Sequence, residues 1–278
     1  MSRIQPFFQR WGDTLKFCIW GILMVLVCFL LYRVGVNGFA EQKRVPMTSL
    51  ERDSLMTVAV PGGLTDTLVR YEAFDVHFNA GWGIANCTAY ELVMGELQGQ
   101  AERVGTFMAD AGVKGCPSPL DYEGSGMDRG HLVPAADLSW NAQAIRQSFL
   151  MTNVCPMHKA LNEGGWAKLE EKVREWAVRD SALLVFTGPV VSDSDSSLAS
   201  SRVTVPSAYF KVVMAPCVRP RRVIAFIYPN GHSGGRLRQY AVSVDEVESR
   251  TGLDFFSGLP QEEQHRLESR VNLDAFVN

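Results

Sequence analysis

The stretch Asp128-Arg129-Gly130-His131, followed 31 residues later by Asn162, is the part of the sequence around which the remaining chain can be interpreted. A neutral imidazole has an unperturbed pKa of about 6.5, so it can accept a proton from water near neutral pH. Arginine presents a planar fork of donors that suits phosphate. Gly130 allows a close backbone approach, and Asp128 can orient a neighbour. We therefore take His131 as a candidate general base and Arg129 as a candidate phosphate ligand.

Asn162 has two interpretations. Apolar residues that recur at steps of three and four predict an amphipathic helix over 163–178, namely Trp166, Leu169, Val173, Trp176 and Ala177. Asparagine just before a helix is a preferred N-cap. Its amide oxygen is also a hard ligand that suits Mg²⁺, which takes few protein ligands and keeps several waters. Glu170, on roughly the same side of that helix, can hold such waters.

Composition and charge limit the class of protein. The 278 residues are 46% hydrophobic and 21% charged, which is typical of globular domains. The chain has 27 basic and 30 acidic side chains, of which residues 1–40 contain four basic and one acidic. The remaining residues therefore have 23 basic and 29 acidic side chains, a net charge of −6. A globally basic surface is excluded. If the partner is a nucleic acid, a local basic cleft must bind it.

The N-terminal segment predicts export. Residues 17–36 contain an uncharged run of 16 residues, from Phe17 to Tyr32, between Lys16 and Arg33. If uncleaved, the segment is a membrane-spanning signal-anchor. If it is cleaved near Ala40, it is a signal peptide and the product is secreted or periplasmic. A buried core helix is the third interpretation. In the first two, the bulk of the chain lies outside the cytoplasm.

The pattern after residue 40 predicts a linker over 41–67 and one domain over 68–278. Its fold class is α+β, with a mixed, mainly antiparallel sheet and packed helices, preceded by the N-terminal hydrophobic helix. Expected strands lie at 68–78, 85–94, 149–154, 183–187, 203–205, 209–214, 223–228 and 240–244. Expected helices lie at 141–147, 163–178, from 244 onward, and 260–270. Disulfides remain open among Cys87, Cys116, Cys155 and Cys217.

Several motifs together resemble one family. Asp128-Arg129-Gly130-His131, Asn153, and Leu161-Asn162-Glu163-Gly164-Gly165-Trp166 with Leu169-Glu170 resemble the DNA/RNA non-specific endonucleases. This is the ββα-metal family of secreted bacterial nucleases and mitochondrial endonuclease G. The similarity extends over roughly residues 71–267, and it includes segments 187–189, 205–211, 244–253 and 258–260. Linked motifs in the right order are far more specific than one four-residue match.

The resemblance implies roles at the motif positions. His131 would be the general base, and Asn162 the direct protein ligand of a hydrated Mg²⁺, with Mn²⁺ as an alternative ion. Glu170 would hydrogen-bond the water shell of the ion. Arg129 would neutralise charge on the reacting phosphate. Asn153 would orient the site.

The resemblance also implies how the substrate is bound. Arg174 and Arg103 match arginines that contact phosphate. DNA and RNA would be held by their phosphate backbones, cut without sequence preference, and released with 5′-phosphates. Because the family includes dimers, a homodimer is among the expected assemblies. Two other functions remain open, namely an inactive nucleic-acid-binding module of the same fold and a small-nucleotide phosphodiesterase. The presence of His131, Asn162 and Glu170 argues against the inactive module.

Overall fold

The computed structural model describes Met24 and residues 43–103, 105–198 and 201–277. The chain divides into two units, Met1–Lys43 and Arg44–Asn278. The expected hydrophobic helix at 17–36 and the cleavage position at Ala40 lie outside the described residues, Met24 excepted. Among the described residues, we find no helix with the length and apolar character needed to cross a membrane.

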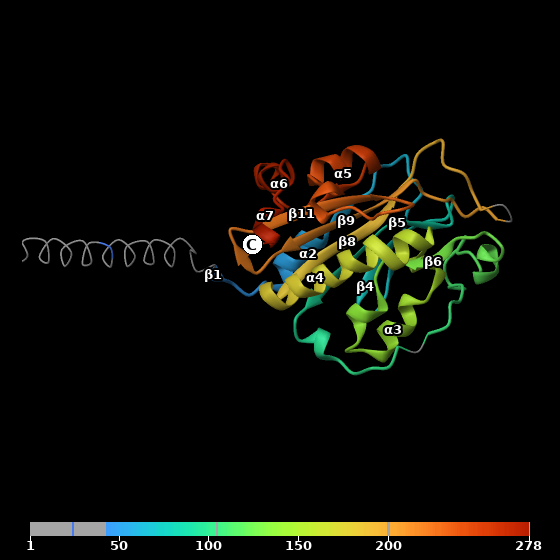
Figure 1. Ribbon diagram of the computed structural model, residues 1–278, viewed down its shortest axis with the longest axis horizontal. Helices are drawn as coiled ribbons and strands as arrows, with labels where there is room; N and C mark the ends of the chain where they lie inside the picture. Colours follow the sequence, from blue (N-terminus) through green and yellow to red (C-terminus); the bar gives the residue numbers. More distant parts are fainter. Residues whose placement is uncertain (1–23, 25–42, 104, 199–200, 278) are drawn as a thin grey trace, which may run out of the picture. The chain divides into compact units, whose positions relative to one another are not determined.

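A seven-stranded sheet forms the centre of the second unit (Figure 1). Its strand order is β12-β11-β9-β8-β5-β4-β3, and every neighbouring pair is antiparallel. The predicted α+β fold with a mainly antiparallel sheet is confirmed. The strands of this sheet are β3 (Thr67–Arg70), β4 (Phe74–Asn79), β5 (Ile84–Val93), β8 (Ala182–Val190), β9 (Ala208–Ala215), β11 (Arg222–Pro229) and β12 (Ala241–Val242).

Both faces of the sheet are covered. Side chains alternate along a strand, so Tyr209 and Val213 of β9 join one apolar cluster, while Phe210 and Val212 join the other. Helices α3 (Ala142–Ser148) and α4 (Ala167–Asp180) contribute to the first cluster. Helices α2 (Ser49–Met56), α5 (Val244–Thr251) and α6 (Gln261–Glu268) contribute to the second. The sheet therefore separates two helical layers, which can be followed in Figure 1.

A second pair of strands and the helix after it carry the motif residues. Strand β6 (Asp128–His131) pairs antiparallel with β7 (Val154–Met157), and the chain then enters a π-helical segment (Leu161–Trp166) that continues into α4. At Gly165 a Cβ atom would lie 2.5 Å from Ser233 Oγ, so only glycine fits there. Two strands followed by a helix form the ββα arrangement that the family resemblance implies.

Three expected elements differ from the observed ones. The single strand predicted at 68–78 is a hairpin, because the chain turns at 71–73, where Tyr71 N donates to Phe74 O at 2.9 Å. The strand predicted at 149–154 begins only at Val154, after a 3₁₀ turn over Met151–Asn153. At 203–205 a single bridge joins Thr204 to Ser197. The remaining strands are β1 (Lys43–Arg44), β2 (Val58–Ala59), β10 (Val218–Arg219) and β13 (Asp254–Phe255), and the last helix is α7 (Asp274–Val277).

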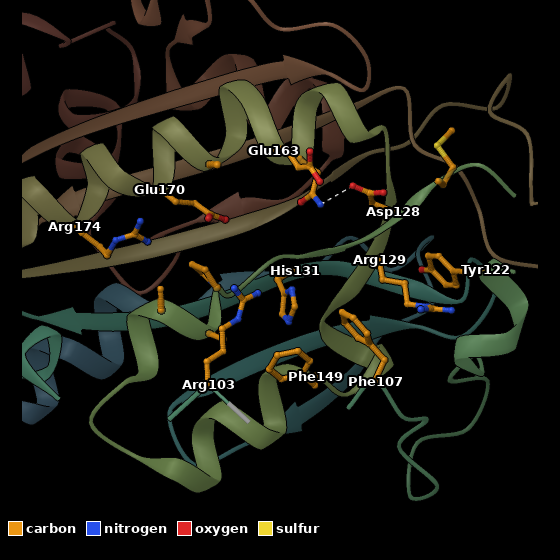
Figure 2. A pocket seen from close by; sticks show the side chains of 16 residues that line it. Arg103, Phe107, Tyr122, Asp128, Arg129, His131, Phe149, Glu163, Glu170 and Arg174 are labelled. Atoms are coloured by element: carbon orange, nitrogen blue, oxygen red, sulfur yellow. Dashed lines mark hydrogen bonds between the residues drawn. The ribbon is translucent and has the colours of Figure 1, made fainter. Parts of the chain in front are cut away.

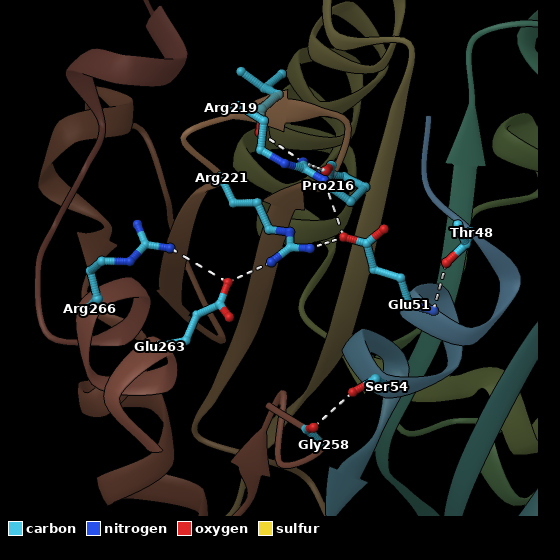
Figure 3. A network of polar contacts seen from close by, with 10 residues as sticks. Thr48, Glu51, Ser54, Pro216, Arg219, Arg221, Gly258, Glu263 and Arg266 are labelled. Carbon is cyan, nitrogen blue, oxygen red and sulfur yellow. Dashed lines mark hydrogen bonds and ion pairs between the residues drawn. The ribbon is translucent and has the colours of Figure 1, made fainter. Parts of the chain in front are cut away.

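The stretch expected as a linker, 41–67, contains α2 and β2 in its described part. A polar network attaches α2 to the C-terminal helices (Figure 3). The Arg221 guanidinium bonds both Glu51 of α2 and Glu263 of α6. Leu55 of α2 is fully buried in the cluster on that face. The four cysteines in the described part, Cys87, Cys116, Cys155 and Cys217, are free thiols.

Candidate active site

A polar cleft of about 760 Å³ lies between the β6 strand and helix α4 (Figure 2). Six of the seven side chains singled out from the sequence line it. They are His131, Arg129, Asn162, Glu170, Arg174 and Arg103. The structure therefore brings together residues that are up to 71 positions apart in the chain.

The side chain of Asn162 is oriented by Asp128. Asn162 Nδ2 donates to Asp128 Oδ2 at 3.0 Å, the dashed line in Figure 2. Asn162 Oδ1 makes no hydrogen bond within the described part of the chain. Asn162 lies inside the π-helical turn rather than at a helix N-cap, and the residue before that turn is Ala160. The capping interpretation of Asn162 is therefore wrong.

His131 sits in an aromatic enclosure. Its ring centroid lies 4.8 Å from that of Phe149, edge-on, and 5.2 Å from that of Phe107. Nε2 is buried and has no hydrogen-bond partner among the described residues. Burial, with a smaller contribution from the positive charge of Arg103, lowers the pKa of His131 to about 4. The imidazole is therefore neutral at pH 7, which is the form that accepts a proton.

Asn153 lies outside the cleft lining and fixes the chain that follows His131. It is fully buried. Its Oδ1 accepts from Val133 N at 3.0 Å, and its Nδ2 donates to Val133 O at 3.0 Å and Ser148 O at 2.9 Å. All three hydrogen bonds of the Asn153 side chain are to backbone atoms, so Asn153 positions the backbone after His131.

Glu170 faces the cleft from the first turn of α4 and has a charged neighbour that sequence reasoning missed. Lys211 of β9 is 1% exposed, donates to Thr187 Oγ1 at 2.8 Å, and lies 4.7 Å from the Trp166 ring centroid. Burial raises the pKa of Glu170 to about 7, although Lys211 acts to lower it. A lysine inside the otherwise apolar run 209–214 was the signal in the sequence that marked this position.

Arg174 follows Glu170 by one helical turn and is held by a buried carboxylate. Its Nη1 donates to Asp137 Oδ1 at 3.0 Å, and Tyr90 Oη donates to Asp137 Oδ2 at 2.7 Å. The Arg174 side chain remains 28% exposed, toward the cleft that it lines. The guanidinium is therefore fixed in place with part of its donor set available to an anion. Asp137 and Tyr90 were also missed by sequence reasoning.

The other two arginines are placed differently. Arg129 Nη2 donates to the Pro119 carbonyl at 3.0 Å, and in Figure 2 its side chain points away from Glu170 toward Tyr122. Its guanidinium carbon lies 5.6 Å from the centroid of Phe107. Arg103 is exposed and lies 6.0 Å from the Phe149 ring centroid, close enough to His131 to affect its pKa. Both contribute positive charge to the cleft.

The donor atoms in the cleft fit a hard divalent cation. Asn162 supplies an amide oxygen that lacks an internal partner, and Glu170 supplies a half-buried carboxylate. Amide and carboxylate oxygens are the ligands that Mg²⁺ and related ions prefer. A cation beside Glu170 would offset the burial that raises its pKa. These residues therefore suit a hydrated ion held by few protein atoms.

Comparisons with known proteins identify the family of this chain. The family model described as DNA/RNA non-specific endonuclease matches residues 51–262. A nuclease of Nostoc sp. is 34% identical over 235 residues, which are 76% of this chain and 84% of that protein. A nuclease of Serratia marcescens is 30% identical over 223 residues, 75% of this chain and 82% of that protein. The mitochondrial nuclease EXOG of Mus musculus is 27% identical and covers 79% of this chain and 65% of its own.

A solved structure of the EndoG/EndoGI complex shares the fold, with a TM-score of 0.66 at 20% identity. The match covers 71% of this chain and 89% of that chain. The resemblance drawn from the sequence motifs is confirmed. Because the family model matches more than half of its length, this chain belongs to the DNA/RNA non-specific endonuclease family.

Proposed function

We propose that this protein hydrolyses phosphodiester bonds of DNA and RNA without sequence preference, with Mg²⁺ as its cofactor and Mn²⁺ as a substitute, leaving 5′-phosphates. Membership in the family makes it a nuclease that acts with a divalent cation. One observation supports the proposed metal and reaction. The neutral, enclosed imidazole of His131 and the Oδ1 atom of Asn162, which has no hydrogen-bond partner among the described residues, line the same cleft.

His131 is the proposed general base. A neutral imidazole takes a proton from the attacking water as the water approaches phosphorus. The phosphate of the substrate is an anion, so it stabilises the imidazolium as it forms and opposes the desolvation that lowers the pKa of the free His131. Asn153 keeps the backbone after His131 in place through its three hydrogen bonds.

Asn162 and Glu170 are the proposed holders of the cation. Asn162 Oδ1 binds it directly, and Asp128 keeps that oxygen turned outward by accepting from Nδ2. Glu170 accepts hydrogen bonds from the waters of the ion. When bound, the ion stabilises negative charge on the phosphate and on the leaving oxygen.

The arginines are the proposed phosphate contacts. Arg174 is fixed by Asp137 and keeps part of its guanidinium toward the cleft, so it suits a neighbouring phosphate of the strand. Arg103 and Arg129 add positive charge on the His131 side. Because guanidinium groups in such a cleft contact phosphate rather than base edges, they favour cleavage that ignores sequence.

The test is a cleavage assay on the full chain, purified in mild detergent, with supercoiled DNA and with RNA while Mg²⁺ or Mn²⁺ is titrated. Both polymers should be cut, and EDTA should stop the reaction. His131→Ala should lower kcat by about 10²- to 10⁴-fold with an unchanged circular dichroism spectrum. His158→Ala, an exposed histidine outside the lining of the cleft, is the matched control and should keep its activity.

Two results would overturn the proposal. Intact DNA and RNA at all concentrations of both ions would exclude the nuclease activity. Cleavage of a mononucleotide diester without cleavage of polymers would instead indicate a small-nucleotide phosphodiesterase. The end chemistry is checked separately, because products with 5′-phosphates can be joined by a ligase without prior phosphorylation.

We further propose that the enzyme acts outside the cytoplasm, held by its N-terminal segment or released by cleavage near Ala40. The support is the uncharged run of 16 residues that follows Arg3, Arg10 and Lys16. N-terminal sequencing of the protein from membrane and soluble fractions distinguishes the anchored form from the cleaved form. Recovery of the intact chain in the cytosolic fraction would contradict export.

A further inference from the structure

A cluster of carboxylates lies on the opposite side of the sheet from the cleft. Asp245 is in the first turn of α5, Glu248 is one turn later, and Glu268 is the last residue of α6. One carboxylate oxygen of each lies within 4.8 Å of the others. The cluster thus joins the beginning of one helix to the end of another, in the layer that contains Val247 and Leu267.

Glu268 is the unusual member of the cluster. Its side chain is 4% exposed, and its Oε1 has no hydrogen-bond partner among the described residues. A carboxylate at the C-terminal end of a helix is also disfavoured by the helix dipole. A buried carboxylate oxygen without a partner costs free energy, unless a proton or a cation compensates it.

The surroundings of Glu268 add further negative charge. Burial raises the pKa of Glu268 to about 8, and the neighbouring charges that raise it further belong to Glu248, Asp245 and Asp254. Glu248 already accepts from Phe255 N at 2.8 Å through Oε1, which fixes its position. The neighbouring groups that shift this pKa are all acidic. A bound cation would offset this accumulation of negative charge.

We propose that Asp245, Glu248 and Glu268 bind a hard divalent cation, Ca²⁺ by preference, which ties α5 to α6. Ca²⁺ takes oxygen ligands at about 2.3–2.6 Å, so two ligands on opposite sides of the ion are about 4.6–5.2 Å apart. The three carboxylate oxygens all lie within 4.8 Å of one another, so a single ion with ligands at this distance can contact each of them. Mg²⁺ demands near-ideal octahedral geometry with ligands at about 2.0–2.1 Å, which three side chains from two helices meet less readily than the flexible coordination of Ca²⁺. Three carboxylates leave the remaining positions to water.

This site is separate from the catalytic cation of the cleft. Its residues belong to the layer of α5 and α6, whereas Asn162 and Glu170 belong to the layer of α4. The role that we assign to this ion is structural. An ion that binds the folded chain and not the unfolded chain stabilises the fold by mass action. We therefore expect Ca²⁺ to raise the unfolding temperature without supporting cleavage of DNA.

Binding is measured by equilibrium dialysis of ⁴⁵Ca²⁺ on the full chain, in the background of Asn162→Ala, which removes the proposed ligand in the cleft. One Ca²⁺ per chain should bind. Adding Glu268→Gln should weaken that binding about tenfold or more, because a charged ligand is lost. Glu246→Gln is the matched control, since Glu246 lies on the same helix but pairs with Arg250 at 2.8 Å. It should bind Ca²⁺ normally.

Thermal unfolding followed by circular dichroism provides the second readout. In the same Asn162→Ala background, Ca²⁺ at 100 times its Kd should raise the Tm by about 5 °C or more, and adding Glu268→Gln should reduce that rise to about half or less. If Glu268→Gln fails to fold, Asp245→Asn replaces it, because Asp245 is exposed. No saturable Ca²⁺ binding, or binding that Glu268→Gln and Asp245→Asn leave unchanged, would overturn the proposal. The first result would instead indicate that Glu268 and Glu248 hold a shared proton.

Discussion

The amide of Asn162 and the carboxylate of Asp128 form a hydrogen bond of 3.0 Å between residues 34 positions apart. The bond joins β6 to the π-helical turn before α4, so it fixes two parts of the ββα motif to each other. It also decides which end of the amide faces the cleft, because Nδ2 is occupied and Oδ1 is left outward. Asp128, the first residue of the Asp128–His131 stretch, thus orients Asn162, the proposed ligand of the cation.

The first prediction concerns Asp128→Ala. Without its acceptor, the amide of Asn162 can rotate, so its oxygen faces the cleft for only part of the time. We expect the Mg²⁺ concentration for half-maximal cleavage to rise about 10- to 100-fold. The measurement is the initial rate of plasmid relaxation as Mg²⁺ is titrated. Glu163→Gln, a neighbouring carboxylate paired with Lys159, is the control and should leave the titration unchanged. Equal titrations for Asp128→Ala and wild type would exclude the orienting role.

The second prediction concerns the protonation of His131. Because burial lowers its pKa to about 4, the neutral base persists as the pH falls and is lost only near pH 4. Phe107→Ala opens the enclosure to water, so the pKa should rise toward about 6.5. Histidine ring resonances followed by NMR across pH 3–8 give both values. A wild-type His131 that titrates near pH 6.5 would show that water already reaches the ring.

The third prediction concerns Lys211→Met, which removes the buried charge beside Glu170 with little change in volume. Lys211 lowers the pKa of Glu170, so its loss should move that pKa above about 7. At pH 7 a proton then competes with the cation, and more Mg²⁺ should be needed for half-maximal activity. Raising the pH to about 9 removes the proton and should restore the wild-type titration. Thr187→Val keeps the charge, loses the 2.8 Å hydrogen bond, and serves as the control.

The fourth prediction concerns Asn153→Ala. The substitution leaves the buried N–H of Val133 and the carbonyls of Val133 and Ser148 without their partners. A buried unpaired group costs about 1–3 kcal/mol, so we expect a loss of at least about 3 kcal/mol in the free energy of unfolding. Urea denaturation measures it. Asn141→Ala, which removes an N-cap of α3, should cost only about 1 kcal/mol. A loss of activity without destabilisation would give Asn153 a direct role in the reaction instead.

The sequence was sufficient where local patterns carry the information. Alternation and apolar runs located the strands near 85–94, 183–187, 209–214 and 223–228, and helical spacing located α4. The linked motifs led to six of the residues that line the cleft. These features depend on neighbours within a few positions, or on a motif that combines several positions.

What the sequence did not reveal depends on distant contacts. The lysine in the otherwise apolar run 209–214 is visible in the sequence, but its coupling to Glu170 arises only when β9 packs beneath α4. The enclosure of His131 requires Phe107 and Phe149, which lie on either side of it in the chain. The turn at 71–73 was missed because its residues lack glycine and proline, the usual marks of a turn.

The position of Lys211 on β9 has one more consequence. Its neighbours Phe210 and Val212 point into the opposite apolar cluster, and β9 is paired on both sides, to β8 and to β11. A slip of β9 by one residue would turn the lysine into that cluster and bring a phenylalanine or valine beneath the carboxylate of Glu170. The alignment of three central strands therefore preserves the charge balance of the cleft, and insertions in the loops that set this alignment should inactivate the enzyme while the sheet remains intact.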